Sequence, residues 1–403
     1  MGVAAVASFS GTMARSPAAT ILRLRSAPFR TQHFDMHPAD PASLAPIVAW
    51  GGFAIAFVFG FVANKTNFCT MGAVSDIVAM GDWNRMRMWL LAIAVAVLGA
   101  NALDLAGLVD LRKSIYPTAN FTWLSYVVGG VLFGVGMTLG SGCGSKTLVR
   151  VGGGNLKSVV VLVFMAISAY MTLRGLFGAF RVAVLEPVSV QLAGAQDLPS
   201  VLSRSLGFER EATKLGAALL VGGGLGAFAL APRAARTADV LLGGTVVGLV
   251  IVAGWWVTGH LGYLPEHPET LDEAFVATNT GRMESLSFVA PQAFLLELLM
   301  LWTDRSKIVT FGIAAALGVI AGSAAYALVA RKFRLESFRD PVDMLRHMLG
   351  GTLMGFGGVV ALGCTVGQGV SGFSTLALGS MLTFLAIVAG AALTMRYEYS
   401  RMA

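Results

Sequence analysis

The sequence predicts an all-α, polytopic helical membrane protein with two homologous halves, about nine spanning helices and short re-entrant helices. Three observations lead to this fold class. The chain of 403 residues is 56% hydrophobic and 13% charged, whereas soluble proteins average about 25% charged residues. Charge-poor stretches of near-spanning length recur along the chain. A glycine-rich segment that ends in cysteine occurs twice.

The duplicated segment defines the two halves. Its first copy, GGVLFGVGMTLGSGC, covers 129–143, and its second copy, GGTLMGFGGVVALGC, covers 350–364. A shift of 221 residues (364 − 143) superimposes five glycines and the final cysteine. Such agreement is improbable by chance, so we infer an internal duplication. If the short segment 285–302 does not cross the bilayer, the copies run in opposite directions, as in transporters whose sites lie where inverted repeats meet. If 285–302 does cross, the repeats are parallel.

The first half is expected at 44–232, after an irregular N-terminal tail at 1–43. A polar turn around Cys69 leads into an apolar stretch that ends at Met80 and is too short to cross. We expect a re-entrant helix pair there, because irregular backbone is tolerated at membrane depth only where protein or water covers it. The expected spans of this half are 43–63, 86–109, 121–142, 156–180 and 213–231.

The second half is expected at 237–403. Its segment 285–302 is apolar but short, and Pro291 and Glu297 interrupt it, so a second re-entrant helix is expected. The basic loop 331–334 is placed in the cytoplasm by the positive-inside rule. The expected spans of this half are 238–258, 308–330, 344–362 and 374–394.

The net charge of +7 does not indicate nucleic-acid binding, because most lysines and arginines lie in short loops, where they set membrane topology. The three cysteines form no CxxC pair and the five histidines form no ligand-spaced cluster with them, so neither a metal nor a cofactor is predicted. No GxxxxGK[ST] nucleotide motif occurs. Asp76 and Asp104 fit either a proton pathway or helix packing.

The cysteines are the main candidates for function. Cys69, Cys143 and Cys364 each lie in a turn where an apolar stretch becomes polar, beside glycine or other small residues. A structural cysteine more often fills space in the middle of a helix. Each alone could be a packing residue, but two are related by the duplication and together they favour function. A disulfide between Cys143 and Cys364 is the structural alternative.

These turns suit a soft anion that contains sulfur or selenium. A thiol is a weak donor and a polarizable contact. Glycines let backbone N–H groups approach a ligand, and half-helix N-termini form anion sites. Lys146 is the favoured cationic neighbour, whereas Arg150 and Lys157 fit a topology signal equally well. The place of Lys146 in the second copy holds Gly367 and Gln368, so the halves are chemically unequal. The glycines singled out are Gly142, Gly144, Gly363 and Gly367.

From about residue 44 onward, the cysteine turns, the glycine helices and the duplication resemble the YeeE/YedE family of membrane sulfur-transport proteins, which includes thiosulfate uptake transporters. The resemblance implies an inverted-repeat helical fold with short non-spanning helices around a constricted centre. It also implies that Cys69, Cys143 and Cys364 line the path and pass the ion by thiol-to-sulfur hydrogen bonds. The family's Cys-Thr-x-Gly-His/Gln-Gly turn occurs at 364–369, but the first copy reads Cys-Gly-Ser-Lys from Cys143. Relatives imply a small soluble sulfur-carrier protein as partner, or selenium metabolism.

The sequence therefore predicts a transporter in the cytoplasmic (inner) membrane that takes up a small sulfur-containing anion, thiosulfate first, rather than an enzyme. Its predicted partners are the anion and the lipid bilayer, with no nucleic acid. One alternative is a membrane sulfurtransferase that carries a cysteine persulfide, which needs an activated thiolate near a cation such as Lys146. A transporter for a related sulfur or selenium compound and a scaffold without substrate are further alternatives.

Overall fold

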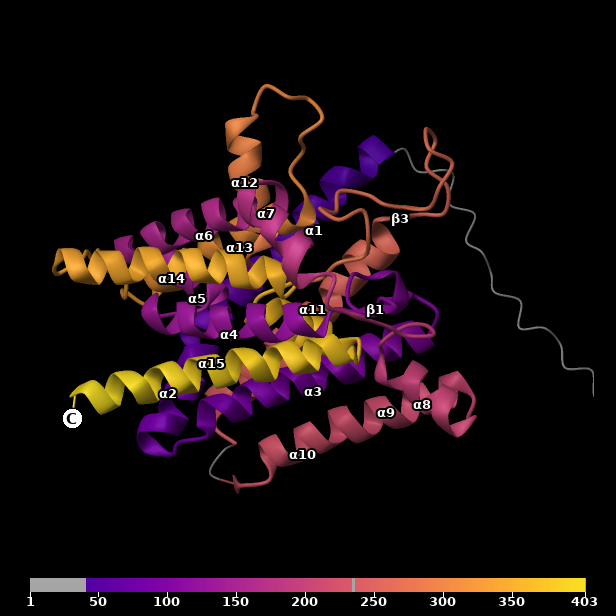
Figure 1. Ribbon diagram of the computed structural model, residues 1–403, viewed down its shortest axis with the longest axis horizontal. Coiled ribbons are helices and arrows are strands. Elements are labelled where there is room, and N and C mark those ends of the chain that lie inside the picture. The colour runs from indigo at the N-terminus through magenta and orange to yellow at the C-terminus, as the bar shows by residue number, and fades with distance from the viewer. Residues whose placement is uncertain (1–40, 234–235, 403) are drawn as a thin grey trace, which may run out of the picture. The chain divides into compact units, whose positions relative to one another are not determined.

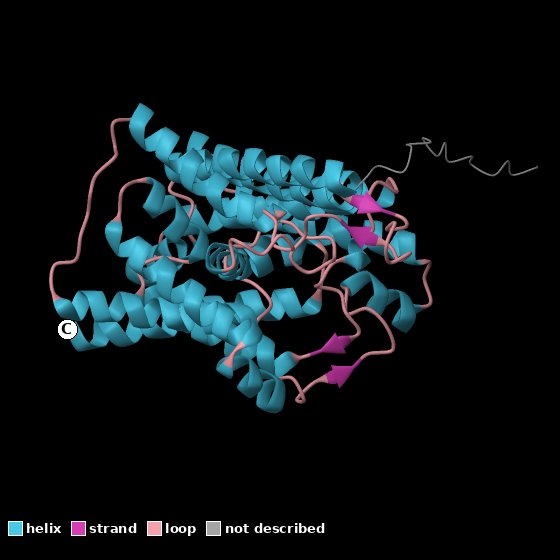
Figure 2. Cartoon of the chain, turned by 90° about the horizontal axis from the view of Figure 1, so that it is seen from above, coloured by secondary structure: helices cyan, strands magenta, loops and turns pink. Residues whose placement is uncertain are grey.

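The computed structural model describes residues 41–233 and 236–402, and these are overwhelmingly helical. The predicted tail lies outside the described residues up to position 40, and α1 begins at Pro41. Two small antiparallel strand pairs lie at the end of the helices opposite to the C-terminus (Figure 2). They are β1 (Asn120–Phe121) with β2 (Val190–Gln191), and β3 (Tyr263–Leu264) with β4 (Ala274–Phe275).

The same order of long and short helices occurs twice along the chain (Figure 1). The first set is α1 (Pro41–Lys65), α2 (Thr70–Met80), α3 (Asn84–Leu105), α4 (Trp123–Leu139), α5 (Gly144–Gly152) and α6 (Leu156–Arg174). The second set is α11 (Ala238–Trp256), α12 (Ala290–Met300), α13 (Phe311–Val329), α14 (Pro341–Val360), η6 (Gly367–Gly372) and α15 (Leu378–Met402). The connecting segments hold η1 (Leu111–Lys113), α7 (Leu176–Phe180), η2 (Arg181–Leu185), α8 (Leu198–Leu206), α9 (Arg210–Ala218), η3 (Leu219–Gly223), α10 (Gly224–Leu230) and η5 (Val257–Leu261).

Eight helical segments of the described chain are long and apolar enough to cross a membrane, which confirms the polytopic fold. The predicted span 344–362 forms α14, which is not among the eight because its first turns carry Asp343, Arg346 and His347. The predicted span 156–180 ends earlier, since extended backbone at Gly175 separates α6 from α7. The eight segments are 41–80, 84–105, 123–152, 156–174, 210–230, 238–261, 311–329 and 378–401.

The main contacts between the first and the second set of helices occur in pairs, and in the second member of each pair the two sets have changed places. α1 packs on α13 as α11 packs on α3, and α4 packs on α15 as α14 packs on α6. α4 also packs on α14, and α1 packs on α11. In Figure 1, α4 lies between α14 and α15. Contacts that recur when the sets are exchanged describe a pseudo-twofold arrangement.

Glycines let the two duplicated helices, α4 and α14, approach closely. A Cβ added at Gly136 would lie 2.7 Å from the Gly350 carbonyl oxygen, and one at Gly357 would lie 2.6 Å from that of Gly129. Small residues are what allow such backbone approach between membrane helices. Because the start of α4 meets the end of α14, the two helices are antiparallel. This confirms the inverted repeat among the alternatives considered from the sequence.

Candidate functional site

Each of the three cysteines directly precedes a short helical segment. Cys69 is the N-cap of α2 and Cys143 is the N-cap of α5, both with extended backbone. Cys364 precedes the helical turn at 365–366 that continues into η6. The three side chains are buried, with at most 4% of the residue surface exposed, and all are free thiols. The Cys143–Cys364 disulfide considered as an alternative is therefore not formed.

The two duplicated turns share an uncommon backbone conformation. Ser141 has φ 57° and Leu362 has φ 58°, in the left-handed region that few residues other than glycine adopt. The next residue closes the end of the preceding helix in both copies: Gly142 N–H donates to the Met137 carbonyl at 2.9 Å, and Gly363 N–H donates to that of Gly358 at 2.7 Å. This is the Schellman pattern of helix termination. It places each cysteine at the start of the next helical segment.

Backbone N–H groups point at two of the thiols. Gly72 N–H donates to Cys69 Sγ at 3.3 Å. Gly367 N–H and Phe288 N–H both donate to Cys364 Sγ at 3.3 Å. Cys143 Sγ instead lies 3.3 Å from the Ser145 hydroxyl. The Gly72 and Gly367 N–H groups belong to helical turns that directly follow the cysteines, where N–H groups lack partners within the helix and also bind anions.

The tertiary structure brings the cysteine turns together. The side chains of Cys69 and Cys143 lie within hydrogen-bonding reach of each other. Thr365, the residue after Cys364, faces the Cys143 thiol. Three turns from distant parts of the sequence thus form one buried cluster of thiols, small residues and helix N-termini.

Two phenylalanines hold equivalent places beside this cluster. Phe68 precedes Cys69, and Phe288 precedes Val289, the residue before α12. Phe59 contacts both rings, with ring centroids 6.3 Å from Phe68 and 5.4 Å from Phe288. α12, the short helix that corresponds to α2, therefore has Val289 as its N-cap, whereas the N-cap of α2 is Cys69. Sequence reasoning did not find the Phe288 contact with Cys364, because Phe288 lies outside the glycine-cysteine motif that guided the search.

The predicted glycines lie at close approaches. A Cβ on Gly144 would be 3.0 Å from the Phe288 carbonyl oxygen, and one on Gly367 would be 2.6 Å from the Ser287 hydroxyl. Side chains on Gly142 and Gly363 would meet the Lys146 and Gln368 side chains, respectively. Gln368 donates to the Ala361 carbonyl at 2.5 Å, while its buried amide oxygen has no partner among the described residues.

Cations gather on one side of the cysteines. Lys146 Nζ donates to Asn67 Oδ1 at 2.5 Å, and Arg150 donates to the Ser141 carbonyl at 2.7 Å. Arg85, which the sequence analysis did not select, contacts Asp76. α5 leads from Cys143 to the basic loop 331–339, where Arg334 N–H donates to the Gly153 carbonyl at 3.1 Å. The cationic side is therefore the side predicted to face the cytoplasm.

The remaining charged candidates have structural partners. Asp104 pairs with Lys214, which joins α3 to α9 through a buried ion pair and fits the helix-packing interpretation. Lys157 pairs with Asp343 at 2.6 Å, between α6 and α14. Within the described residues, no group of three His, Cys, Asp or Glu side chains is placed to hold a metal ion.

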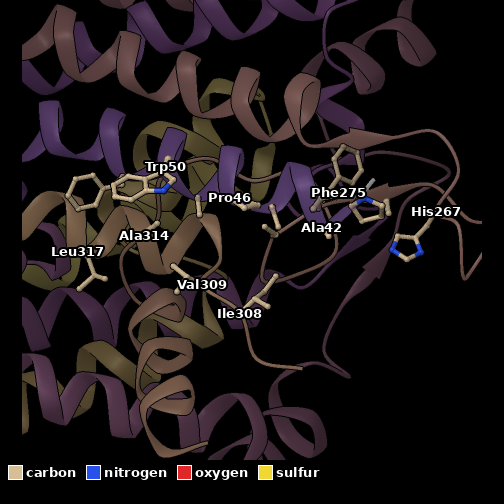
Figure 3. A pocket seen from close by; sticks show the side chains of 16 residues that line it. Ala42, Pro46, Trp50, His267, Phe275, Ile308, Val309, Ala314 and Leu317 are labelled. Atoms are coloured by element: carbon tan, nitrogen blue, oxygen red, sulfur yellow. The ribbon is translucent and has the colours of Figure 1, made fainter. Parts of the chain in front are cut away.

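An apolar groove of about 970 Å³ lies away from the cysteines (Figure 3). It is lined by the first half of α1, by β4 and the residues after it, and by the start of α13, with Trp50, Phe275 and Leu317 among its side chains. None of the three cysteines lines it. The groove is on the outside of spanning helices, whereas the thiol cluster is packed inside the protein.

Comparison with known proteins links this arrangement to sulfur transport. A family model described as sulphur transport matches residues 65–393. The chain is 29% identical over 345 residues to a thiosulfate transporter, TsuA, of Escherichia coli, a match that covers 79% of this chain and 86% of that protein. It is 28% identical over 357 residues to the thiosulfate transporter TsuA of Spirochaeta thermophila, which covers 85% of this chain and 96% of that protein.

Proposed function

Because the chain belongs to the sulphur transport family, we propose that it takes up thiosulfate through the cytoplasmic membrane along a path formed by Cys69, Cys143 and Cys364. The observation that carries this proposal is the meeting of three free, buried thiols at the starts of three short helical segments. Two similar proteins are named thiosulfate transporters, which supports the choice of substrate.

The chemistry of the turns fits thiosulfate better than a hard oxyanion. Thiosulfate has a terminal sulfur that can accept a hydrogen bond from a thiol, and oxygens that can accept from backbone N–H groups at the helix starts. Sulfur contacts are individually weak. Conduction needs sites that bind well enough to admit the ion and weakly enough to release it. Three adjacent weak sites satisfy this requirement.

The one-sided cations suit inward movement of an anion. Moving one elementary charge against a membrane potential of 100 mV costs about 2.3 kcal/mol, and a dianion meets roughly twice that cost when the cell interior is negative. Lys146 and Arg150 lie on the side that the positive-inside rule places in the cytoplasm. Their charge lowers the energy of the anion where the potential is least favourable. A small soluble sulfur-carrier protein would receive the sulfur on that side.

Uptake of labelled thiosulfate by cells that lack other importers tests the proposal. We expect Cys143→Ala to abolish uptake at normal protein levels, because Cys143 lies between Cys69 and the Cys364 turn. Ser205→Ala, which removes an exposed hydroxyl on α8, serves as the control and should transport normally. Full uptake by Cys143→Ala would refute the cysteine path.

Mass spectrometry separates transport from the sulfurtransferase alternative. A transporter should recover its unmodified mass after exposure to thiosulfate, whereas a sulfurtransferase should retain an added sulfur atom on a cysteine. The burial of all three thiols argues against direct transfer to a soluble acceptor. A persistent persulfide on Cys143 would favour the enzyme.

A further inference from the structure

We propose that Arg85 and Lys146 form a second anion subsite on the cytoplasmic side of Cys69, and that Asp76 occupies Arg85 when this subsite is empty. The inference rests on the proposed transport of a sulfur-containing dianion and adds a place where the anion is held after the thiols. Arg85 thereby becomes a binding residue, and Asp76 becomes a competitor that helps to release the anion.

Arg85 is held against the cysteine turn. Its Nε lies 2.9 Å from Asp76 Oδ2, and the Asp76 side chain is 9% exposed while that of Arg85 is 34% exposed. Nη1 lies over Gly72 so closely that an added Cβ would overlap it. Gly72 is the residue whose N–H donates to the Cys69 thiol. The guanidinium therefore lies within one turn of Cys69.

A second cation lies beside the same turn. Lys146 reaches across to Asn67, two residues before Cys69, and Asn67 is exposed. Arg85, Arg150, Cys69 and Cys143 are all close enough to Lys146 to interact with it electrostatically. An anion between Lys146 and Arg85 would thus be attracted by both cations while it remained near the Cys69 thiol.

The charge around this turn is net positive, which suits an anion. The charged groups around this turn are Arg85, Lys146 and Arg150 against Asp76 and the neighbouring Asp82. An incoming dianion can replace Asp76 at the guanidinium. Arginine binds oxyanions through paired, charge-assisted N–H donors, and a dianion brings two negative charges to Arg85 and Lys146 where Asp76 brings one. While the anion is bound, Asp76 is a buried carboxylate without its cation, and this cost favours release of the anion and return of Asp76 to the guanidinium.

The second half of the chain also has a buried carboxylate on the counterpart of α2. When the starts of α2 and α12 are aligned, Glu297 lies one position after the residue that matches Asp76 (76 + 220 = 296). Glu297 is 5% exposed and pairs with Lys307 at 2.8 Å and with Arg174 at 3.6 Å. The shift of 221 that relates the cysteine turns places Gly367 at the position of Lys146, and the shift of 220 that aligns α2 with α12 places Ser287 at that of Asn67. A carboxylate–cation pair on a short helix is thus common to both halves, and the first half has Lys146 beside its cysteine turn where the second has Gly367.

Anion binding to the purified full-length protein in lipid nanodiscs tests the subsite. The measured quantity is the thiosulfate concentration that produces half of the maximal rise in melting temperature. We expect Arg85→Gln to raise this concentration about tenfold or more, since it removes a charge-assisted contact. Arg85→Lys should lose less, because it keeps the charge. Asp76→Asn should lower the concentration, because the competing carboxylate is gone.

Glu297→Gln is the matched control. It removes a buried, ion-paired carboxylate from α12, the counterpart of α2, and should change the melting temperature without anion but leave the half-maximal thiosulfate concentration unchanged. If the Asp76–Arg85 pair only holds α2 in place, Asp76→Asn and Arg85→Gln will behave like Glu297→Gln. That result would overturn the subsite.

The subsite and the transport proposal can fail separately. Suppose that the unaltered protein takes up no thiosulfate, but that Arg85→Gln raises and Asp76→Asn lowers the half-maximal thiosulfate concentration. That result would overturn transport and support the subsite. Cysteine-dependent uptake with unchanged binding in both variants would overturn the subsite and support transport.

Discussion

Substituting Gly350 by alanine should separate the two duplicated helices. A Cβ there would lie 2.5 Å from the Gly140 amide nitrogen and 2.7 Å from the Gly136 carbonyl oxygen, whereas ordinary contact begins at 3.4 Å. α4 and α14 would have to move apart by about 0.9 Å, the difference between 3.4 and 2.5 Å. The obstructing atoms belong to the backbone, so a change of rotamer cannot relieve the clash. Overpacking of this kind costs about 1–3 kcal/mol, and the higher helix propensity of alanine offsets about 1 kcal/mol.

We therefore expect Gly350→Ala to lose about 1 kcal/mol of stability and to reduce thiosulfate uptake, because the same helices position Cys143 and Cys364. Thermal unfolding of the purified protein measures the first effect. Gly224→Ala on α10 is the control: no atom lies within 4 Å of its added Cβ, so stability should stay level or rise slightly. If Gly350→Ala unfolds at the same temperature as the unaltered protein, then the close contact between the glycines does not determine the distance between α4 and α14.

Three further predictions concern stability, pH and the second cysteine turn. Lys214→Met should lower the free energy of unfolding by about 3–5 kcal/mol, because it leaves Asp104 buried without its partner. If thermal unfolding shows that Lys214→Met loses less stability than the double variant Lys214→Met, Asp104→Asn, this reasoning is wrong. Glu284 lies between the spanning segments, and burial raises the pKa of its carboxyl from 4.5 to about 8. The native state therefore holds this proton where the unfolded state has lost it, so the melting temperature should fall as pH rises from 5 to 8, and less steeply in Glu284→Gln. An equally steep fall in that variant would exclude Glu284 as the cause. Gly367→Ala should lower uptake because its Cβ meets the Ser287 hydroxyl at 2.6 Å, and Ser287→Gly in the same chain should restore it; no rescue would contradict the steric reason.

Most of the fold could be predicted from local patterns. Apolar runs of spanning length located the helices, and the short segments after Cys69 and before Met300 were recognised because they cannot cross a bilayer. α14 shows the limit of this reasoning. It was predicted from its glycine repeat, yet its charged first turns make it less apolar than the eight clear spans.

The candidate site could be predicted only in part. The cysteines and their glycines were found because residue type and spacing are visible along the chain. Arg85 was missed because it lies directly before the predicted span 86–109, where an arginine normally only sets topology. Its partner Asp76 was noticed as a charge in an apolar stretch, but nothing nearby in the sequence showed whether it served a proton pathway or an ion pair.

The sequence by itself determined the membrane class, the duplication and the three cysteine turns, because hydropathy, helix length and internal repetition are properties of contiguous segments. Only the tertiary structure decided that the copies are antiparallel, that Cys69 meets Cys143, and that Phe288 donates to Cys364, 76 residues away. Such contacts depend on how helices pack. The glycines that permit close packing fit many pairings, and only the assembled set of helices selects one.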